Sequence, residues 1–351
     1  MTAPPVSAES AVTAPLLRIE DLEVVYYTDA GPLPALSDVS FEVGRGEIVG
    51  VVGESGCGKS TLGAALLRLL PPNGALAGGH VFVEGRDVAG LSRGELRSLR
   101  GRTVSMVFQD PLTSLNPTFT IGQQMIAAQR AHARDHESKS ELRRRAAEAL
   151  TRVGIPDAAQ RIDSHPHEFS GGMRQRVMIA IALLHEPSLL IADEITSALD
   201  VTLEAQILKL LAEINETHGT AILLISHNLG VIAEICRRVV VMYAGRTVEE
   251  GDVLSIFDDP LHPYTRALLA AVPSRERRGA LLAAIPGRVP SLLAMPPGCK
   301  FADRCGHVRE VCREREPGFL ARGERRVRCF IYDEELAPAD RPVTTAGTVT
   351  P

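Results

Sequence analysis

Short apolar runs alternate with segments of helical periodicity along most of this chain. The runs that predict β-strands are Leu17–Tyr27, Val39–Val43, Ile48–Val52, His80–Val83, Thr103–Phe108, Ser188–Ala192, Thr220–Ile225 and Val239–Ala244. Helical patterns fill the stretch after Ser60, Thr120–Gly154, the run after Ser170, and Val201–Thr217. Because strands that alternate with helices usually pair in parallel, this pattern predicts an α/β core around a largely parallel sheet.

One region, residues 109–169, departs from this alternation. Charged helix formers dominate it, as in Ser138–Leu150, and it carries no strand pattern. We therefore interpret this region as an inserted helical subdomain. The segments 1–15 and 333–351 are rich in Ala, Pro and Thr, and their composition predicts disordered tails. The chain shows no internal repeat, which indicates a single unit of this kind.

The composition fits a packed soluble protein. Apolar residues make up 45% of the 351 residues, and charged residues make up 23%. The net charge of −5 gives no support for nucleic-acid binding. No apolar run approaches the length of about 18 residues that spans a bilayer, and the amino terminus lacks a secretory signal. We therefore expect a cytosolic chain whose membrane role comes through partners.

A glycine-rich segment, Gly53–Thr61, lies between the apolar run Ile48–Val52 and a helical stretch. It matches the pattern G-x-x-x-x-G-K-[ST] in its strand–loop–helix context. Glycines allow backbone N–H groups to converge on phosphates, a lysine adds a positive charge, and a hydroxyl can hold Mg²⁺. A glycine-rich turn that binds nothing is the weaker alternative. The predicted ATP-binding residues of this loop are Gly53, Ser55, Gly56, Cys57, Gly58, Lys59, Ser60 and Thr61.

Three apolar strands end in polar residues that suit ATP chemistry. Asp193 and Glu194 end one of them, where the aspartate can position the Mg²⁺ held by Ser60 and the glutamate can polarise an attacking water. His227 follows a second strand and can bond the γ-phosphate and hold Glu194 in register. Gln109 ends a third and could reach the metal or the water. Taken singly, each has an ordinary alternative as a solvated strand end.

A second anion-binding helix end is predicted at Phe169–Arg176. Ser170 is a candidate N-cap, and the two glycines after it allow close approach of the backbone. One chain with one triphosphate does not need two such ends. The segment makes sense if it closes on ATP that another subunit holds.

With these motifs in place, the chain resembles an ABC transporter ATP-binding subunit from about Leu16 to Cys329. The matching motifs are Walker A (Gly53–Thr61), the Q-loop (Gln109), the signature (Ser170–Gln175), Walker B (Leu189–Glu194), the D-loop (Ser197–Asp200) and the switch histidine (His227). The resemblance implies catalytic roles for Glu194, His227, Gln109 and Lys59. It implies nucleotide contacts for Tyr26, Gln109, Ser170, Gly171, Gly172, Gln175 and Asp193, and Mg²⁺ contacts for Ser60, Gln109 and Asp193. Tyr26 fits the aromatic residue that stacks on adenine, with Tyr27 as its alternative.

The implied fold is a P-loop ABC nucleotide-binding domain over residues 16–258. It comprises a RecA-like core, a β-subdomain and the helical subdomain, and a small Cys-rich extension follows at 259–332. Some stretches are similar to oligopeptide/dipeptide importer ATPases, namely Phe108–Pro111, Ser114–Pro117, Phe169–Met178, Ala198–Thr202 and His262–Thr265.

The importer resemblance implies a set of partners and a location. The partners are a second ABC ATP-binding subunit in a heterodimer, two membrane-spanning permease subunits and an extracytoplasmic solute-binding protein. The location is peripheral, at the cytoplasmic face of the cell membrane. Ile195 stands where the family usually has proline, and it is expected to loosen the turn that places Glu194. It is the only support for one alternative, a non-hydrolysing regulatory cassette. A soluble, non-transport ABC ATPase is the other, and the transported solute is not encoded here.

Six cysteines fall into two groups. Cys57 and Cys236 are expected to be small buried fillers. The other four lie close together in the sequence, which in a cytosolic protein favours metal over disulfides. They are Cys299, Cys305, Cys312 and Cys329.

Thiolates suit zinc or an iron–sulfur cluster, and the Cys-x2–4-Cys pairs common in zinc sites are missing here. Resemblance to the importer extension favours a [4Fe–4S] cluster, with Zn²⁺ or no metal as alternatives. The cations beside the four cysteines are expected to offset the negative charge of such a cluster. They are Lys300, Arg304, Arg313 and Arg328.

Overall fold

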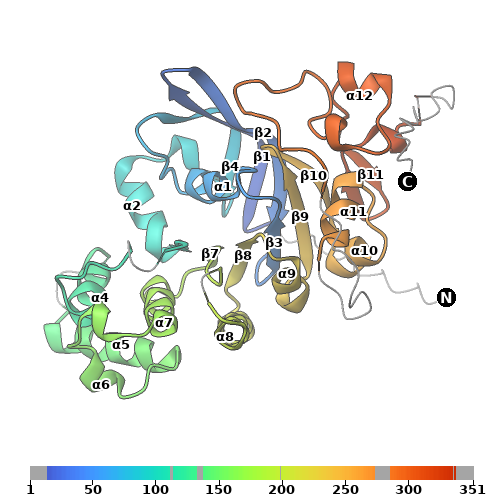
Figure 1. The fold of residues 1–351 in the computed structure, drawn as a ribbon. Coiled ribbons are helices and arrows are strands. Elements are labelled where there is room, and N and C mark those ends of the chain that lie inside the picture. Colours follow the sequence, from blue (N-terminus) through green and yellow to red (C-terminus); the bar gives the residue numbers. More distant parts are fainter. Residues whose placement is uncertain are drawn as a thin grey trace, which may run out of the picture.

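The computed structural model describes residues 14–110, 114–132, 137–197, 199–272, 285–334 and 336. The expected tails, 1–15 and 333–351, lie outside the described residues except for a few positions. Within the described part, the chain forms two sheets with helices packed around them (Figure 1).

The larger sheet has eight strands in the order β11-β12-β10-β9-β3-β8-β7-β6. They are β3 (Ile48–Val52), β6 (Val104–Val107), β7 (Leu189–Asp193), β8 (Ala221–Ser226), β9 (Arg238–Tyr243), β10 (Arg246–Asp252), β11 (Leu320–Arg322) and β12 (Arg325–Val327). The strands from β9 to β6 pair in parallel. β3, β7 and β8 are buried along their whole length, which explains their unbroken apolar sequences. The predicted parallel α/β core is therefore confirmed at the centre of this sheet.

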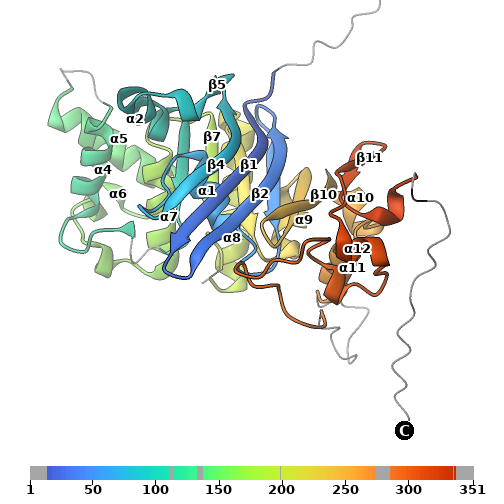
Figure 2. The ribbon, with the colours of Figure 1, turned by 90° about the horizontal axis from the view of Figure 1, so that it is seen from above.

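Two other parts of the fold are antiparallel, so the expectation of a largely parallel sheet was too simple. A separate sheet has the order β2-β1-β4-β5 and is built from β1 (Leu17–Thr28), β2 (Gly31–Val43), β4 (Gly74–Val83) and β5 (Arg86–Asp87). β10, β12 and β11 extend one edge of the larger sheet by antiparallel pairing. Figure 2 shows the smaller sheet lying across α1 (Lys59–Leu66), and apolar side chains of both share one core.

The remaining helices differ in which part of the fold they cover. They are α2 (Arg93–Arg102), α4 (Ile121–Arg130), α5 (Lys139–Arg152), α6 (Ala158–Arg161), α7 (Gly171–Ala182), α8 (Val201–His218), α9 (Leu229–Ile235), α10 (Val253–Asp258), α11 (Pro263–Ala270) and α12 (Glu310–Glu314). Helices α4, α5 and α6 form an arm beside the end of α7 (Figure 1). Thr120 and Ser138 start α4 and α5 with capping boxes, which satisfy their free N–H groups. The described part of residues 109–169 contains no strand, as the helical composition predicted.

The segment 259–332, which we call the C-terminal extension, is joined to the larger sheet through β12. Its first turn is anchored by Glu249 of β10, a fully buried carboxylate that accepts hydrogen bonds from the backbone N–H groups of Leu261 and His262 at 2.8 and 2.9 Å. Because a buried carboxylate needs such donors, the start of the extension stabilises Glu249 in β10.

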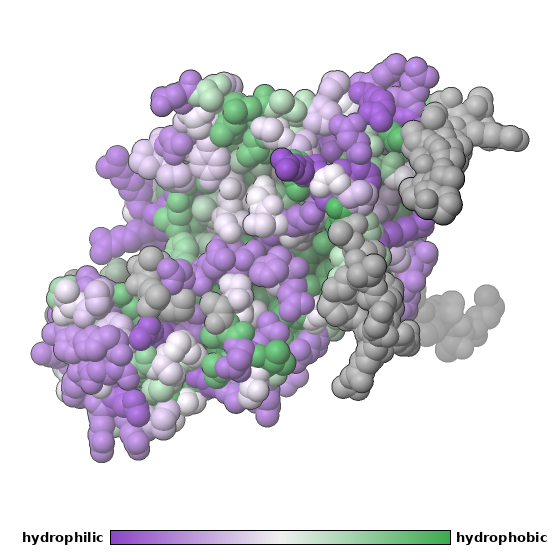
Figure 3. All heavy atoms as spheres, viewed as in Figure 1, coloured by the Kyte–Doolittle hydropathy of each residue, from purple (hydrophilic) through white to green (hydrophobic). Residues whose placement is uncertain are grey.

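The surface of the arm formed by α4, α5 and α6 is mostly hydrophilic on the face seen in Figure 3. Across the ranges that the structure describes, we find no helix with the length and apolar character needed to cross a bilayer.

Candidate nucleotide site

The glycine-rich loop connects β3 to α1, as the sequence predicted. Gly58 is the N-cap of α1 and adopts φ +102°, in the left-handed region that favours glycine. A Cβ atom on Gly53 would lie 2.2 Å from the carbonyl oxygen of Met242. These two positions therefore require glycine, one for its backbone conformation and the other for close packing against the end of β9.

Lys59 lies at the centre of the loop, and its side chain is only 4% exposed. Its Nζ donates hydrogen bonds to the carbonyl oxygens of Gly53 (2.9 Å) and Glu54 (3.1 Å). It also lies 3.6 Å from Oε1 of Glu194. The ammonium group is thus held by the loop itself, at the place where the phosphate charge of a nucleotide would be balanced.

Ser60 and Asp193 come together from the first turn of α1 and the end of β7. The Ser60 hydroxyl donates to Oδ1 of Asp193 at 3.2 Å. Burial raises the pKa of the Asp193 carboxyl, and the nearby charge of Glu194 adds to this effect. A hydroxyl and a carboxylate are oxygen donors of the type that Mg²⁺ prefers, so the pair fits the predicted magnesium site.

The polar residues at two other strand ends, Gln109 and His227, both lie beside Glu194. Its Oε2 accepts a hydrogen bond from Gln109 Nε2 (3.0 Å) and lies 3.4 Å from Nδ1 of His227. The structure thus places His227 beside Glu194, and its role of holding that residue in register stays a prediction. Gln109 was expected to reach the metal or the water, and here it contacts the carboxylate instead.

The turn after β7 holds Glu194 in an uncommon backbone conformation. Its φ is +46°, which a non-glycine residue adopts only when the surroundings impose it. The Glu194 N–H donates to the carbonyl oxygen of Ile225 at 2.9 Å, and the side chain of Ile195 is buried in the larger core. Ile195 was expected to loosen this turn. Because exposing such a side chain costs about 1.5–3 kcal/mol, the buried Ile195 anchors the turn to the core.

A solvent-open cleft of about 230 Å³ lies against some of these groups. It is lined by Tyr26, Ala35, Ser55, Gly56, Gly58, Lys59, Ser60, Thr61, Gln109, Glu194 and Leu292. The Tyr26 hydroxyl is 3.2 Å from the Thr61 hydroxyl, whereas Tyr27 is 61% exposed and is not part of this lining. Tyr26 is therefore the better placed of the two for an adenine ring. Leu292 belongs to the C-terminal extension, and no sequence signal pointed to it.

The signature segment lies elsewhere, since none of its described residues is part of the cleft lining. Ser170 caps α7 as predicted, with its hydroxyl accepting from the Met173 N–H at 3.3 Å. Ser170 and Gly171 are exposed, but Gly172 packs closely against Leu203 of α8. Gln175, expected to contact nucleotide, is only 1% exposed, so its side chain does not share the outward face of Ser170.

The four clustered cysteines line one small cavity in the C-terminal extension, with a volume of about 20 Å³, enough for about one water molecule. All are free thiols, and burial raises the pKa of Cys299 to about 11 and that of Cys329 to about 12. Within the described ranges, no three His, Cys, Asp or Glu side chains are grouped in a way that would hold a metal ion. Cys57 and Cys236 are buried in the cores, as expected for small fillers.

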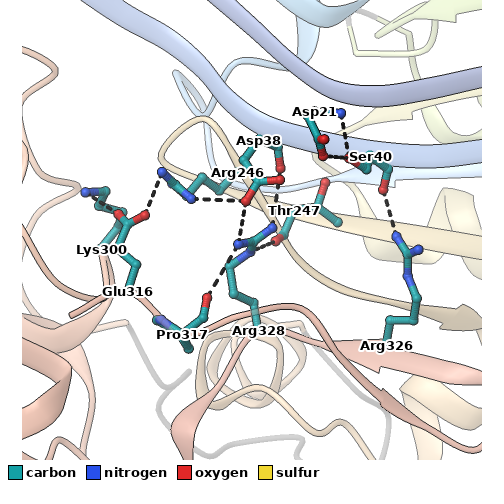
Figure 4. Close-up of polar contacts among 10 residues, drawn as sticks. All are labelled: Asp21, Asp38, Ser40, Arg246, Thr247, Lys300, Glu316, Pro317, Arg326 and Arg328. Carbon is teal, nitrogen blue, oxygen red and sulfur yellow. Dashed lines mark hydrogen bonds and ion pairs between the residues drawn. The ribbon is translucent and has the colours of Figure 1, made fainter. Parts of the chain in front are cut away.

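The cations beside these cysteines have other partners than the thiols. Lys300 pairs with Glu316, Arg304 with Glu54, Arg313 with Asp303 and Arg328 with Asp38. Figure 4 shows Arg328 and Arg246 meeting at Asp38 of β2, and Glu316 joining Arg246 to Lys300. These pairs fix the extension internally, to β2 and to the glycine-rich loop, and the expectation that the same cations offset a cluster's charge stays a prediction.

The fold and the cleft define a P-loop nucleoside triphosphatase. Family models match residues 36–197 as ABC transporter, and residues 248–312 as the C-terminal region of oligopeptide/dipeptide transporters. The oligopeptide transport ATP-binding protein OppD of Salmonella typhimurium is 46% identical over 94% of this chain and 99% of its own length. The dipeptide transport ATP-binding protein DppD of Bacillus subtilis is 44% identical over 92% and 97%.

Among solved structures, the dimeric ATP-binding cassette MJ0796 in a post-hydrolysis state with ADP and Pi is similar, with a TM-score of 0.61 and 27% identity. The similarity covers 68% of this chain and 98% of that one. The chain belongs to the ABC transporter family, among the ATP-binding proteins of its oligopeptide/dipeptide branch. The predicted cassette fold and ATPase activity are thereby confirmed, and the relatives favour an ATP-hydrolysing transporter subunit over both alternatives.

Proposed function

We propose that this chain powers the uptake of di- and oligopeptides or related solutes, as one of two cassettes in an importer. The observation that carries this proposal is the separation of two phosphate-binding elements. The cleft supplies Lys59, Ser60 and Glu194, whereas the helix end at Ser170 is exposed outside it. Each ATP would then lie between the loop of one cassette and the signature segment of the other.

The residues of the cleft suggest how hydrolysis proceeds. Backbone N–H groups of the loop and Lys59 bind the phosphates, and Glu194 orients and polarises the attacking water. Gln109 and His227 hold that carboxylate from two sides. Mg²⁺ bound beside Ser60 and Asp193 would neutralise charge on the phosphates.

A groove next to Gln109 supports a connection to permease subunits. It has a volume of about 360 Å³ and lies between the larger sheet and the helical arm, with Phe108, Leu115 and His132 among its lining residues. Phe108 precedes Gln109 in the sequence, and Gln109 contacts Glu194. A segment of a partner bound in this groove would therefore respond to a change at Glu194 through Gln109. Movement of the arm on ATP binding would then pass to the membrane.

The proposed complex contains a second ATP-binding subunit, two membrane-spanning permease subunits and an extracytoplasmic solute-binding protein. The names of OppD and DppD support a peptide substrate, and the dimeric state of the MJ0796 cassette supports pairing of cassettes. This chain would lie peripherally at the cytoplasmic face of the cell membrane.

An uptake experiment tests this function. Cells that lack this chain should lose accumulation of a labelled di- or oligopeptide, and the wild-type chain should restore it. A Lys59→Ala chain should leave uptake at the level of the deletion, because the charge that binds phosphate is gone. A panel with glutathione and metal chelates in place of peptides identifies the solute. Normal peptide uptake without the chain would contradict the proposal for peptides.

We also propose that Cys299, Cys305, Cys312 and Cys329 bind a [4Fe–4S] cluster with a structural role, with Zn²⁺ as the alternative. Their number and type suit such a cluster, and all four line one cavity. When bound, the cluster would cross-link segments of the extension that are far apart in sequence. The raised pKa values of Cys299 and Cys329 mean that binding must also displace the protons of these two thiols.

Metal analysis of protein purified without oxygen tests this site. We expect about four iron atoms and about four acid-labile sulfides per chain. A Cys299→Ser chain should lose them, whereas Cys236→Ala, a change at a buried cysteine of the larger core, should keep them. Zinc without iron would show that the alternative is correct, and absence of both would contradict a metal site.

A further inference from the structure

Glu54, the second residue of the phosphate loop, is bonded through all of its polar groups. Its N–H donates to the Tyr264 hydroxyl at 2.8 Å. Its carbonyl oxygen accepts from Lys59 Nζ and from the Cys57 N–H, at 3.1 and 3.2 Å. Its carboxylate forms a two-bond pair with Arg304, at 2.7 and 3.0 Å. One residue thus connects the lysine of the loop to two residues of the C-terminal extension.

Arg304 is held rigidly on the side of the extension. Its side chain is only 4% exposed, and its guanidinium group also donates to Tyr243 Oη (3.2 Å) and to the carbonyl oxygen of Pro286 (2.8 Å). Its Cζ lies 5.7 and 5.8 Å from the ring centres of Tyr243 and Phe301. A buried guanidinium with this many partners has one orientation, so it also fixes the carboxylate that it binds.

The charge of Glu54 explains why such a partner is needed. Its carboxylate belongs to the loop that must receive a triphosphate, and a negative charge in that loop repels the charge of its ligand. Arg304 cancels that charge within the protein. Tyr264 accepts the hydrogen bond from the Glu54 N–H, so the N–H, carbonyl and carboxylate groups of Glu54 are all paired.

We propose that Arg304 and Tyr264 are positioning residues for ATP binding: the C-terminal extension sets the phosphate loop through Glu54. Neither residue lines the cleft. They act through the Glu54 carboxylate and backbone, which in turn place Lys59. The inference rests on ATP hydrolysis at this site and is independent of the transported solute and of metal at the cysteines.

The test compares KM and kcat for ATP in purified full-length chains assembled with their partners. Arg304→Met should raise KM about tenfold or more, because it leaves the carboxylate of Glu54, a residue of the phosphate loop, unpaired. The value of kcat at saturating ATP should change much less, since Glu194 and its partners are untouched. Arg304→Lys keeps the charge but loses the two-bond geometry, so its KM should fall between those of the wild type and Arg304→Met.

Two further variants separate this role from a general loss of stability. Tyr264→Phe preserves the ring that packs 4.6 Å from Tyr243 but removes the acceptor for the Glu54 N–H, and it should also raise KM. Arg313→Met removes a cation of the same extension whose pair with Asp303 is exposed, and KM should stay at the wild-type value. A wild-type KM in both Tyr264→Phe and a folded Arg304→Met would overturn the proposal. Lack of ATPase activity in the wild-type complex would instead count against the proposed function.

Discussion

Glu194→Gln should lower ATP turnover about 10²–10⁴-fold while leaving ATP binding intact, as expected for loss of a general base. Glutamine keeps the shape of the side chain and can still accept the hydrogen bond from Gln109. It loses the negative charge that polarises water and that His227 faces at 3.4 Å. Because ATP binds but is not cleaved, the complex should accumulate in an ATP-bound form with the two cassettes closed.

Two measurements check this result. Single-turnover hydrolysis in the assembled complex gives the rate of the chemical step, and retention of labelled ATP after gel filtration gives binding. Glu148→Gln is a matched control, since Glu148 is an exposed carboxylate of α5 that pairs with Arg144. Undiminished turnover in Glu194→Gln would remove Glu194 from the mechanism. An equally low hydrolysis rate in Glu148→Gln would indicate general damage to the complex rather than the specific loss of Glu194.

Strands whose residues are buried on both faces are among those that the sequence predicted well. Ile48–Val52 coincides with β3 because all five of its residues are buried, so burial leaves a continuous apolar signature. β10, by contrast, reads RTVEEGD, and its two glutamates are buried through partners elsewhere in the fold. Glu249 is satisfied by backbone N–H groups of the extension, and Glu250 by Arg238 and Arg326. No local pattern predicts a strand whose polar residues depend on such distant partners.

The same distinction applies to the site. The contact between Ser60 and Asp193 could be anticipated. In this type of fold, the glycine loop and the acidic end of the strand both lie at the carboxyl edge of the sheet. The N-cap role of Ser170 could be anticipated too, but not which residues of α7 face inward, and Gln175 proved to be buried. The pair of Glu54 with Arg304 joins residues 250 positions apart, and nothing near either residue in the sequence indicates it.

Ser170→Asp should reduce turnover of the assembled complex about 10²–10³-fold, the usual cost of losing one preorganised anion-binding group. Aspartate is as good an N-cap as serine, so the hydrogen bond to the Met173 N–H and the start of α7 should be preserved. Its charge, however, would face the triphosphate held by the other cassette. Ser138→Asp makes the same change at the exposed N-cap of α5 and should leave turnover unchanged.

The location of the defect distinguishes a shared site from one within a single chain. Ser170 is not part of the cleft lining, so a purified Ser170→Asp chain should bind ATP with wild-type affinity. In the proposed heterodimer, a photoreactive ATP analogue should label this chain normally and the partner cassette weakly. Lys59→Ala should give the reverse pattern, because it disables the loop of this chain and leaves Ser170 intact. If both variants instead reduced labelling of the same chain, each ATP would be bound by one polypeptide, and the two-cassette mechanism would be wrong.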